Sequence, residues 1–146
     1  MHPVPTFPPE SLFEKLAGQY ADGTKISGVP PEARRAKSIA DHLWRMFNTR
    51  QGAIPHLPDY GLPDIGEIYR KLPASLKDLE RTLLRLATRY EPRLERIRIR
   101  SIPTSPQEFR LSFELAGVMK GGERVCFQTS FTATGETRVL TSKPKD

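Results

Sequence analysis

The sequence has one cysteine, three histidines and no long hydrophobic run. Cys126 has no partner for an internal disulfide, and its place in an alternating apolar segment predicts a small buried residue. The histidines lack the short paired spacings that bring ligands to one metal ion, so we expect no metal and no cofactor. No segment could span a bilayer, and the N-terminus lacks the regions of a secretory signal. We therefore expect a cytoplasmic protein without membrane insertion.

The sequence patterns of common catalytic sites are also missing. There is no Gly-x-Ser-x-Gly elbow and no phosphate-binding loop. Hydrolysis by two carboxylates stays open, because Asp59, Asp64 and Glu91 could converge, and a glycoside hydrolase needs carboxyl groups about 5–9.5 Å apart. A chain with 17 acidic residues offers many such sets, so this pattern is not specific.

Acidic residues are outnumbered by basic ones, 17 against 23, which gives a formal charge of +6. This charge favours an anionic partner, whether nucleic acid, lipid headgroups or an acidic protein. In residues 94–100 arginine alternates with isoleucine, which places three guanidinium groups on one face of a strand. Because this segment lacks aromatic residues for base stacking, we favour a face toward solvent or protein over a nucleic-acid surface.

A chain of 146 residues predicts one domain with one hydrophobic core. Residues 2–9 contain four prolines, which exclude a regular helix and predict an extended arm. Ser11 is placed to cap a short helix, and glycines and prolines in residues 18–31 predict a linker. We therefore divide the chain into an N-terminal arm, residues 1–31, and a folded domain, residues 32–146.

The first long helix is expected from residue 32 to Phe47, and a loop is expected after it. Apolar residues recur at three- and four-residue steps through this segment, and Pro31 suits a first helical turn. Residues 48–62 then hold two glycines and two prolines. Long loops of this kind are either disordered or functional, and the apolar residues among them, such as Tyr60, predict an ordered, docked loop.

A second amphipathic helix is expected between Ser75 and Tyr90. Its apolar residues form one stripe, and Ser75 followed by Asp78 resembles a capping box at its start. Pro92 ends this helix, because the residue before a proline is steered out of the helical region.

The last third of the chain has the two-residue period of β-strands. Apolar and polar residues alternate over 96–100, 109–115 and 125–131, which predicts three half-buried strands. The Gly121-Gly122 pair predicts a hairpin between the second and third, and residues 137–141 are expected to add a short edge strand. The fold class is therefore α+β, with N-terminal helices packed on a three- to four-stranded antiparallel sheet in a single domain.

Glu91 occupies a position that is unfavourable for a carboxylate. It follows the second long helix, where the negative end of the helix dipole destabilises an anion by about 0.3–1 kcal/mol. We infer a hydrogen-bonded pair with Arg50 or Arg93, which either clamps the loop or is offered to a partner. On this hypothesis, Glu91→Gln leaves the fold largely intact and weakens assembly.

Three motifs follow one another along the chain: Asn48-Thr49-Arg50-Gln51-Gly52, Leu57-Pro58-Asp59-Tyr60-Gly61-Leu62-Pro63-Asp64 and Tyr90-Glu91-Pro92-Arg93-Leu94. In their order and spacing they resemble the TssE family of type VI secretion baseplate subunits, which is related to the wedge protein of contractile-tailed phages. The resemblance extends from about Ser38 to Phe131 and covers the N-terminal arm least.

The resemblance implies a structural role without catalysis. It implies binding to the wedge proteins TssF and TssG, with TssK in the same complex, and no nucleic acid. It also implies contact with the sheath proteins TssB and TssC, whose polymerisation the sheet would start by strand addition. The residues assigned to partner binding are Asn48, Thr49, Arg50, Gly52, Pro58, Asp59, Tyr60, Gly61, Glu91, Pro92, Arg93 and Leu94.

The same family has carried a lysozyme label, which supplies an enzymatic alternative, a peptidoglycan-cleaving hydrolase. Only Glu91 lies in a matching motif as a candidate acid, and no second matching carboxylate is evident. This alternative predicts turnover of cell-wall substrate that Glu91→Gln abolishes, whereas a scaffold predicts none. A third alternative, a nucleic-acid-binding module, predicts an affinity that falls steeply with salt.

Overall fold

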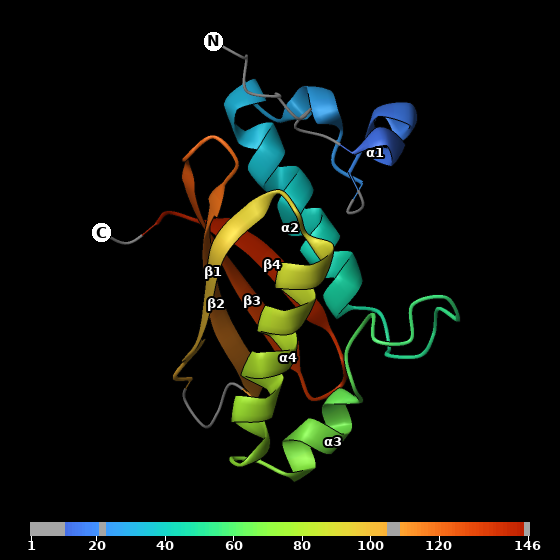
Figure 1. Ribbon diagram of the computed structural model, residues 1–146, viewed down its shortest axis with the longest axis vertical. Helices are drawn as coiled ribbons and strands as arrows, with labels where there is room; N and C mark the ends of the chain where they lie inside the picture. The colour runs from blue at the N-terminus through green and yellow to red at the C-terminus, as the bar shows by residue number, and fades with distance from the viewer. Residues whose placement is uncertain (1–10, 21–22, 105–108, 145–146) are drawn as a thin grey trace.

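The computed structural model describes residues 11–20, 23–104 and 109–144, so the arm predicted at residues 2–9 lies outside the described residues. Four strands form one antiparallel sheet in the order β1-β2-β3-β4, with the long helices α2 and α4 against one face (Figure 1). The predicted α+β class is confirmed. The elements are α1 (Leu12–Ala17), η1 (Ile26–Gly28), η2 (Pro31–Ala33), α2 (Arg34–Phe47), α3 (Ile65–Arg70), α4 (Ser75–Tyr90), β1 (Leu94–Ile102), β2 (Arg110–Met119), β3 (Arg124–Thr132) and β4 (Thr137–Ser142).

The hydrophobic core lies between the sheet and the two long helices, as the helical and strand periods predicted. Phe131 of β3 joins the two layers, because its ring makes edge-to-face contacts with Phe47 and Phe113 at centroid distances of 6.3 and 6.1 Å. Cys126 is buried, also as predicted. The other core residues exposed by 1% or less include Ile39, Leu43, Met46, Leu79, Leu83, Leu86, Leu115 and Phe127.

The hairpin predicted at Gly121-Gly122 joins β2 and β3, where the amide of Met119 donates to the carbonyl of Glu123 at 2.8 Å. Strand β4 pairs with β3 and forms one edge of the sheet, as predicted, and β1 forms the other edge.

Strand β1 contains a bulge that the simple alternation did not predict. Its register against β2 shifts by one residue between Glu95 and Arg98, and Arg96 has a positive φ of 52°. Leu94 is buried and Ile97 is half-buried, although they are three residues apart. Since a regular strand alternates faces, an extra residue is needed to turn both side chains toward the core.

Two helix starts differ from the sequence-based expectation. Helix α2 begins at Arg34, because the predicted first turn forms the separate 3₁₀ helix η2, with Pro31 at its start. The capping box predicted at Ser75 is wrong. Ser75 is the first helical residue, and its hydroxyl donates to the carbonyl of Ile68 at 2.6 Å. This side chain therefore fixes α3 to α4 instead of capping a helix.

The segment before α2 packs on the domain, although residues 18–31 were expected to form a simple linker. Ser11 caps α1 as predicted, through a capping box with Glu14. Tyr20 is 2% exposed, and the ammonium of Lys37 in α2 lies 5.7 Å from the centre of its ring. The boundary at residue 31 stays a prediction.

Candidate functional site

The loop of residues 48–62 projects from the end of α2 and is closed at its base by main-chain hydrogen bonds (Figure 1). The amide of Leu62 donates to the carbonyl of Thr49, and the amide of Gln51 donates to the carbonyl of Leu62, each at 2.8 Å. The Thr49 hydroxyl also donates to the carbonyl of Arg45 in α2 at 2.6 Å. These bonds join the first motif to the second.

Gly61 is the residue that makes this closure possible. Its φ is +100°, in the left-handed region, and a Cβ atom there would lie 2.4 Å from the carbonyl oxygen of Thr49. Because main-chain atoms cannot yield as a flexible side chain does, only glycine fits. The glycine that ends the Pro-Asp-Tyr-Gly sequence is thus required by the close approach of two backbone segments.

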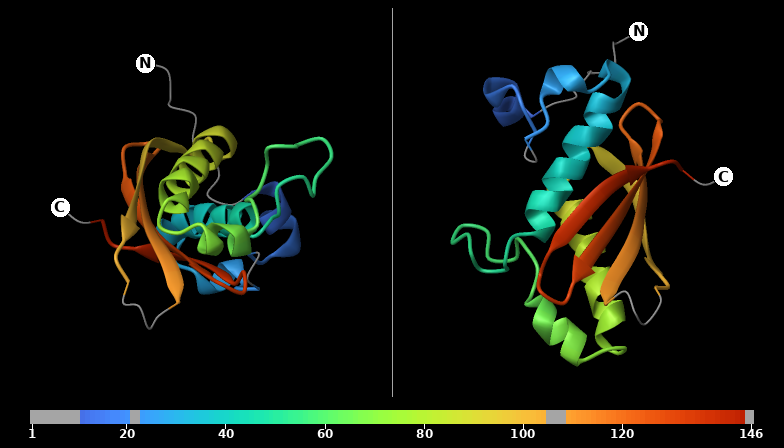
Figure 2. Two further views of the ribbon diagram at one scale, coloured as in Figure 1. Left: turned by 90° about the horizontal axis from the view of Figure 1, so that it is seen from below. Right: turned by 180° about the vertical axis from the view of Figure 1, so that it is seen from behind.

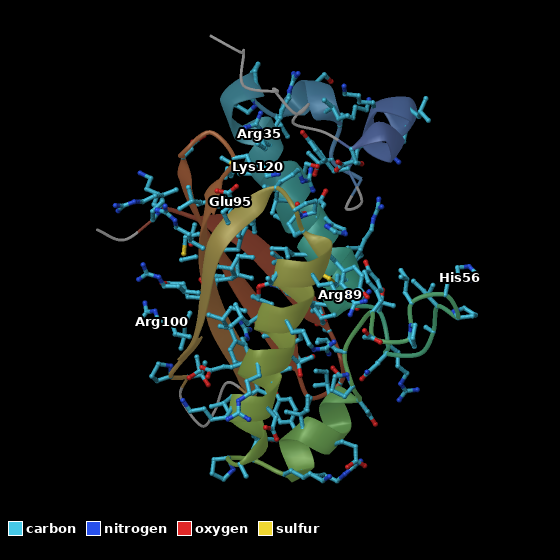
Figure 3. The ribbon with its side chains drawn as sticks, in the orientation of Figure 1. Arg35, His56, Arg89, Glu95, Arg100 and Lys120 are labelled. Atoms are coloured by element: carbon cyan, nitrogen blue, oxygen red, sulfur yellow. The ribbon has the colours of Figure 1, made fainter. Side chains whose placement is uncertain are left out.

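The second motif is docked on the end of α4, where the third motif begins. The rings of Tyr60 and Tyr90 make an edge-to-face contact with centroids 5.0 Å apart. The guanidinium of Arg89, which Figure 3 shows extending toward the loop, donates to Asp59 at 2.8 Å. Burial raises the pKa of Tyr60, and the charge of Arg45 partly opposes this. The predicted docking is confirmed at Tyr60, whereas Leu57 is 37% exposed in the projecting part of the loop.

Glu91 lies beneath this region and is only 1% exposed. Arg93 donates to its two carboxylate oxygens from Nε at 2.8 Å and from Nη2 at 2.9 Å. His42 Nδ1 lies 2.8 Å from Oε2 and must be the donor, because an ionised carboxylate only accepts. Burial alone would raise the pKa of Glu91, but the hydrogen bonds and charges of Arg93 and His42 outweigh it and hold this pKa at about 2.

The hydrogen-bond network of Glu91 continues into α2 and α1. Arg93 Nη1 donates to the hydroxyl of Ser38 at 2.7 Å, and this hydroxyl donates to Glu14 at 2.5 Å. Glu14 is 4% exposed and also accepts from the amide of Ser11 at 2.8 Å. A cavity of about 300 Å³ opens beside these groups. Each charged group thus has partners, which is what makes buried polar groups stable.

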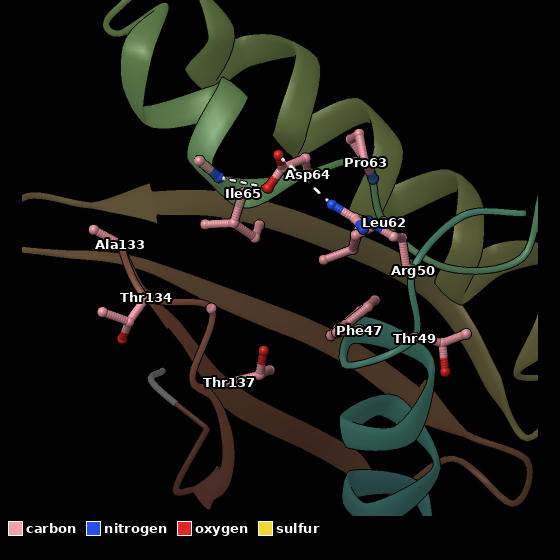
Figure 4. A pocket seen from close by; sticks show the side chains of 12 residues that line it. Phe47, Thr49, Arg50, Leu62, Pro63, Asp64, Ile65, Ala133, Thr134 and Thr137 are labelled. Atoms are coloured by element: carbon pink, nitrogen blue, oxygen red, sulfur yellow. Dashed lines mark hydrogen bonds and ion pairs between the residues drawn. The ribbon is translucent and has the colours of Figure 1, made fainter. Parts of the chain in front are cut away.

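Arg93 is confirmed as the partner of Glu91, whereas Arg50 is not. The guanidinium of Arg50 lies 3.7 Å from Asp64 Oδ2, in a separate cavity of about 270 Å³ (Figure 4). Asp64 also accepts from the amide of Gly66 at 3.0 Å and so caps α3. The weak, exposed pair of Arg50 leaves this side chain accessible from solvent.

Sequence reasoning missed three members of the network: Glu14, Ser38 and His42. The signals were present. Ser38 and His42 are four residues apart in one helix and therefore share a face. Ser11 and Glu14 have the spacing of a capping box.

The residues assigned to partner binding gather around the base of the loop and the end of α4. Gly61, Glu91 and Leu94 are buried, and the others are half-buried or exposed. The buried residues fix the backbone, while the exposed ones are available for contact. The exposed residues are Asn48, Arg50, Gly52, Pro58 and Pro92.

No group of three His, Cys, Asp or Glu residues in the described part of the chain could hold a metal ion. In the same part of the chain, no helix has the length and apolar character needed to cross a membrane.

Residues 33–123 match the family described as "Baseplate wedge protein gp25". This range is more than half of the chain. The chain belongs to the gp25 baseplate wedge family. In this gp25-family chain the matched residues include all three motifs and the pair of Glu91 with Arg93. They begin after α1 and Glu14.

Solved structures share the fold of this gp25-family chain. A chain of "The baseplate complex from the type VI secretion system" is 26% identical with a TM-score of 0.56, over 80% of this chain and 100% of that chain. A structure named as a tail lysozyme from Geobacter sulfurreducens is 17% identical with a TM-score of 0.50, over 76% and 94% of the two chains. At 17% identity, the second structure shows a similarity of fold alone. No curated protein sequence is significantly similar to the gp25-family chain. The resemblance to type VI baseplate subunits is confirmed.

Proposed function

We propose that this gp25-family chain is a cytoplasmic structural subunit that binds TssF and TssG in the type VI baseplate, with TssK in the same complex. The observation that carries the proposal is the convergence of the three motifs on one surface. The bridge between Thr49 and Leu62 and the ion pair between Asp59 and Arg89 hold this surface together. The similarity to a chain of a type VI baseplate complex supports the same role.

The environment of Glu91 supports a scaffold rather than a hydrolase. A glycosidase acid must hold a proton near neutral pH, so its pKa is raised. The pKa of Glu91 is instead lowered to about 2, and Arg93 binds both of its oxygens. Although Glu91 lines the cavity beside this network, only 1% of the residue is exposed, and Arg93 and His42 occupy its carboxylate oxygens.

A charge reversal at Arg50 tests the docking surface. We expect Arg50→Glu to reduce co-purification with TssF and TssG by about tenfold, because a rim cation facing a partner carboxylate becomes repulsive. Arg81→Glu is the matched control, since Arg50 and Arg81 are 73% and 79% exposed and each has one surface aspartate nearby. Both variants should melt like the wild type. Equal co-purification of the two variants would place docking elsewhere.

We also propose that β4 receives a strand of the sheath proteins TssB or TssC. The indole of Trp44 donates to the carbonyl of Thr137 at 3.0 Å, so this carbonyl points away from β3. In an antiparallel strand the main-chain amide and carbonyl groups of every second residue point to the same side of the strand. Those of Val139 and Thr141 therefore also face away from β3. They have the spacing that strand addition requires.

A proline at Val139 tests this contact. Proline lacks the amide hydrogen, yet at an outward-facing edge position it leaves the bonds to β3 intact. We expect Val139→Pro to abolish sheath initiation in a reconstituted baseplate while co-purification with TssF and TssG stays unchanged. The control, Val139→Ala, loses similar side-chain packing but keeps the amide and should still initiate. Normal sheath growth on the proline variant would exclude strand addition here.

A further inference from the structure

The face of the sheet opposite to α2 and α4 carries a shallow cavity of about 520 Å³. In the described part of the chain no helix covers this face (Figure 2). The floor of the cavity is made of small, mostly apolar side chains. Ala116 of β2 is opposite Cys126 of β3, and Val118 is the next outward residue of β2. A short aliphatic side chain of a partner can pack on this floor. The floor itself is too open to be part of a hydrophobic core.

Three arginines surround this floor: Arg96 and Arg98 from β1 and Arg124 from β3. Strands β1 and β3 lie on either side of β2, so the two groups of arginines start about 10 Å apart. The bulge in β1 adds Arg96 to the rim, at a positive φ that a side-chain-bearing residue adopts rarely. All three side chains are exposed.

The next arginine on this face shows what these three lack. Arg100, which points away from α4 in Figure 3, donates from Nε and Nη2 to the two carboxylate oxygens of Glu114 at 3.1 and 3.0 Å. The guanidinium groups of Arg96, Arg98 and Arg124 make no hydrogen bond or ion pair to a described residue. Guanidinium groups gathered in this way attract carboxylates, which they bind through two parallel hydrogen bonds.

We propose that this face binds an acidic segment of a partner protein, whose carboxylates pair with Arg96, Arg98 and Arg124 above the apolar floor. A protein segment fits better than nucleic acid because none of the described residues that line the cavity is aromatic, so bases have no stacking partner. The carboxylate of Glu114 at the rim is paired with Arg100 and leaves the three arginines available to the acidic segment. This arginine surface shares no residue with the docking surface proposed for TssF and TssG. The binding of an acidic segment therefore does not depend on the binding of TssF and TssG.

The test uses the full chain and a fluorescein-labelled peptide in which glutamate alternates with valine. Fluorescence anisotropy should show binding that weakens as salt screens the charges. The double variant Arg98→Ala and Arg124→Ala should bind about five- to tenfold more weakly, because two partly exposed ion pairs are lost. In the wild type, the amide resonances of Ala116, Val118 and Cys126 should shift on titration, which tests the site without any substitution.

The control removes two charges from an exposed part of α4, through Arg81→Ala and Arg85→Ala. This variant should keep its affinity within about twofold. The proposal is overturned by absent binding, by an equal loss in the control or by resonance shifts confined to other surfaces. It is also overturned if a single-stranded oligonucleotide of the same length binds more tightly than the peptide and loses affinity in the same double variant, since the face would then be a nucleic-acid surface.

Discussion

Replacing Glu91 by glutamine is expected to lower the free energy of unfolding by about 3 kcal/mol at neutral pH, because breaking a buried ion pair leaves the other charge uncompensated. The sequence alone predicted a largely intact fold. The structure changes this expectation, since the carboxylate is 1% exposed and holds both Arg93 and His42. Urea denaturation measures the loss, which corresponds to a melting temperature lower by roughly 6–12 °C.

The control for this substitution is Glu67→Gln. Glu67 also pairs with an arginine close in sequence, Arg70, but its side chain is 51% exposed. Such surface pairs contribute about 0–1 kcal/mol, so the control should unfold almost like the wild type. Similar losses in both variants would mean that the network around Glu91 adds no stability.

The pH dependence of the free energy of unfolding, measured for the wild type and for Glu91→Gln, separates the effect of the Glu91 charge from the effect of its packing. Its pKa is about 2 when folded, against an ordinary value of 4.5. A lowered folded pKa means that the stabilisation is complete above about pH 4.5 and is lost as the pH falls toward 2. Between these limits the wild type should lose about 3 kcal/mol more stability than Glu91→Gln. Parallel stability curves would contradict the assigned role of this carboxylate.

Replacing Gly61 by alanine should open the base of the loop. The new Cβ atom would lie 2.4 Å from the carbonyl oxygen of Thr49, and the residue would keep a φ of +100°. We expect a local cost of about 3 kcal/mol from this contact and the backbone strain. Amide hydrogen exchange at Gln51 and Leu62, whose amides close the loop, should become about 100-fold faster.

Gly52→Ala is the matched control for the loop. Gly52 also has a positive φ, +89°, but no atom lies within 4 Å of the position of its Cβ. Only the strain of the left-handed conformation remains, about 1 kcal/mol. If both alanines change amide exchange equally, the close approach of the two backbone segments is not what requires glycine at position 61.

The long elements of the fold follow from the sequence because their packing is periodic. A helix or strand that buries one face repeats its apolar residues, as the stripe up to Phe47 and the alternation through Phe127 do. The bulge at Arg96 breaks this rule. Its signal is the odd spacing of Leu94 and Ile97, which is visible only when both are known to face the core.

The candidate site was predictable in its residues but not in its pairings. The position of Glu91 after a helix called for a cation, and Arg93 is close in sequence. The choice between Arg93 and Arg50 depended on where the loop turns, which Gly61 and Asp64 decide. His42 lies 49 residues from Glu91, and no sequence period reports such a distant contact.

The hydrogen-bond network around Glu91 extends through α1, beyond the residues that match the family. The family match begins at residue 33, whereas the hydrogen-bond network around Glu91 begins at Ser11. Glu14 shares the hydroxyl of Ser38 with Arg93, so a segment outside the common core helps to set the geometry of the third motif. A fragment trimmed to the family range would keep every motif and lose one end of the network that holds the last of them in place.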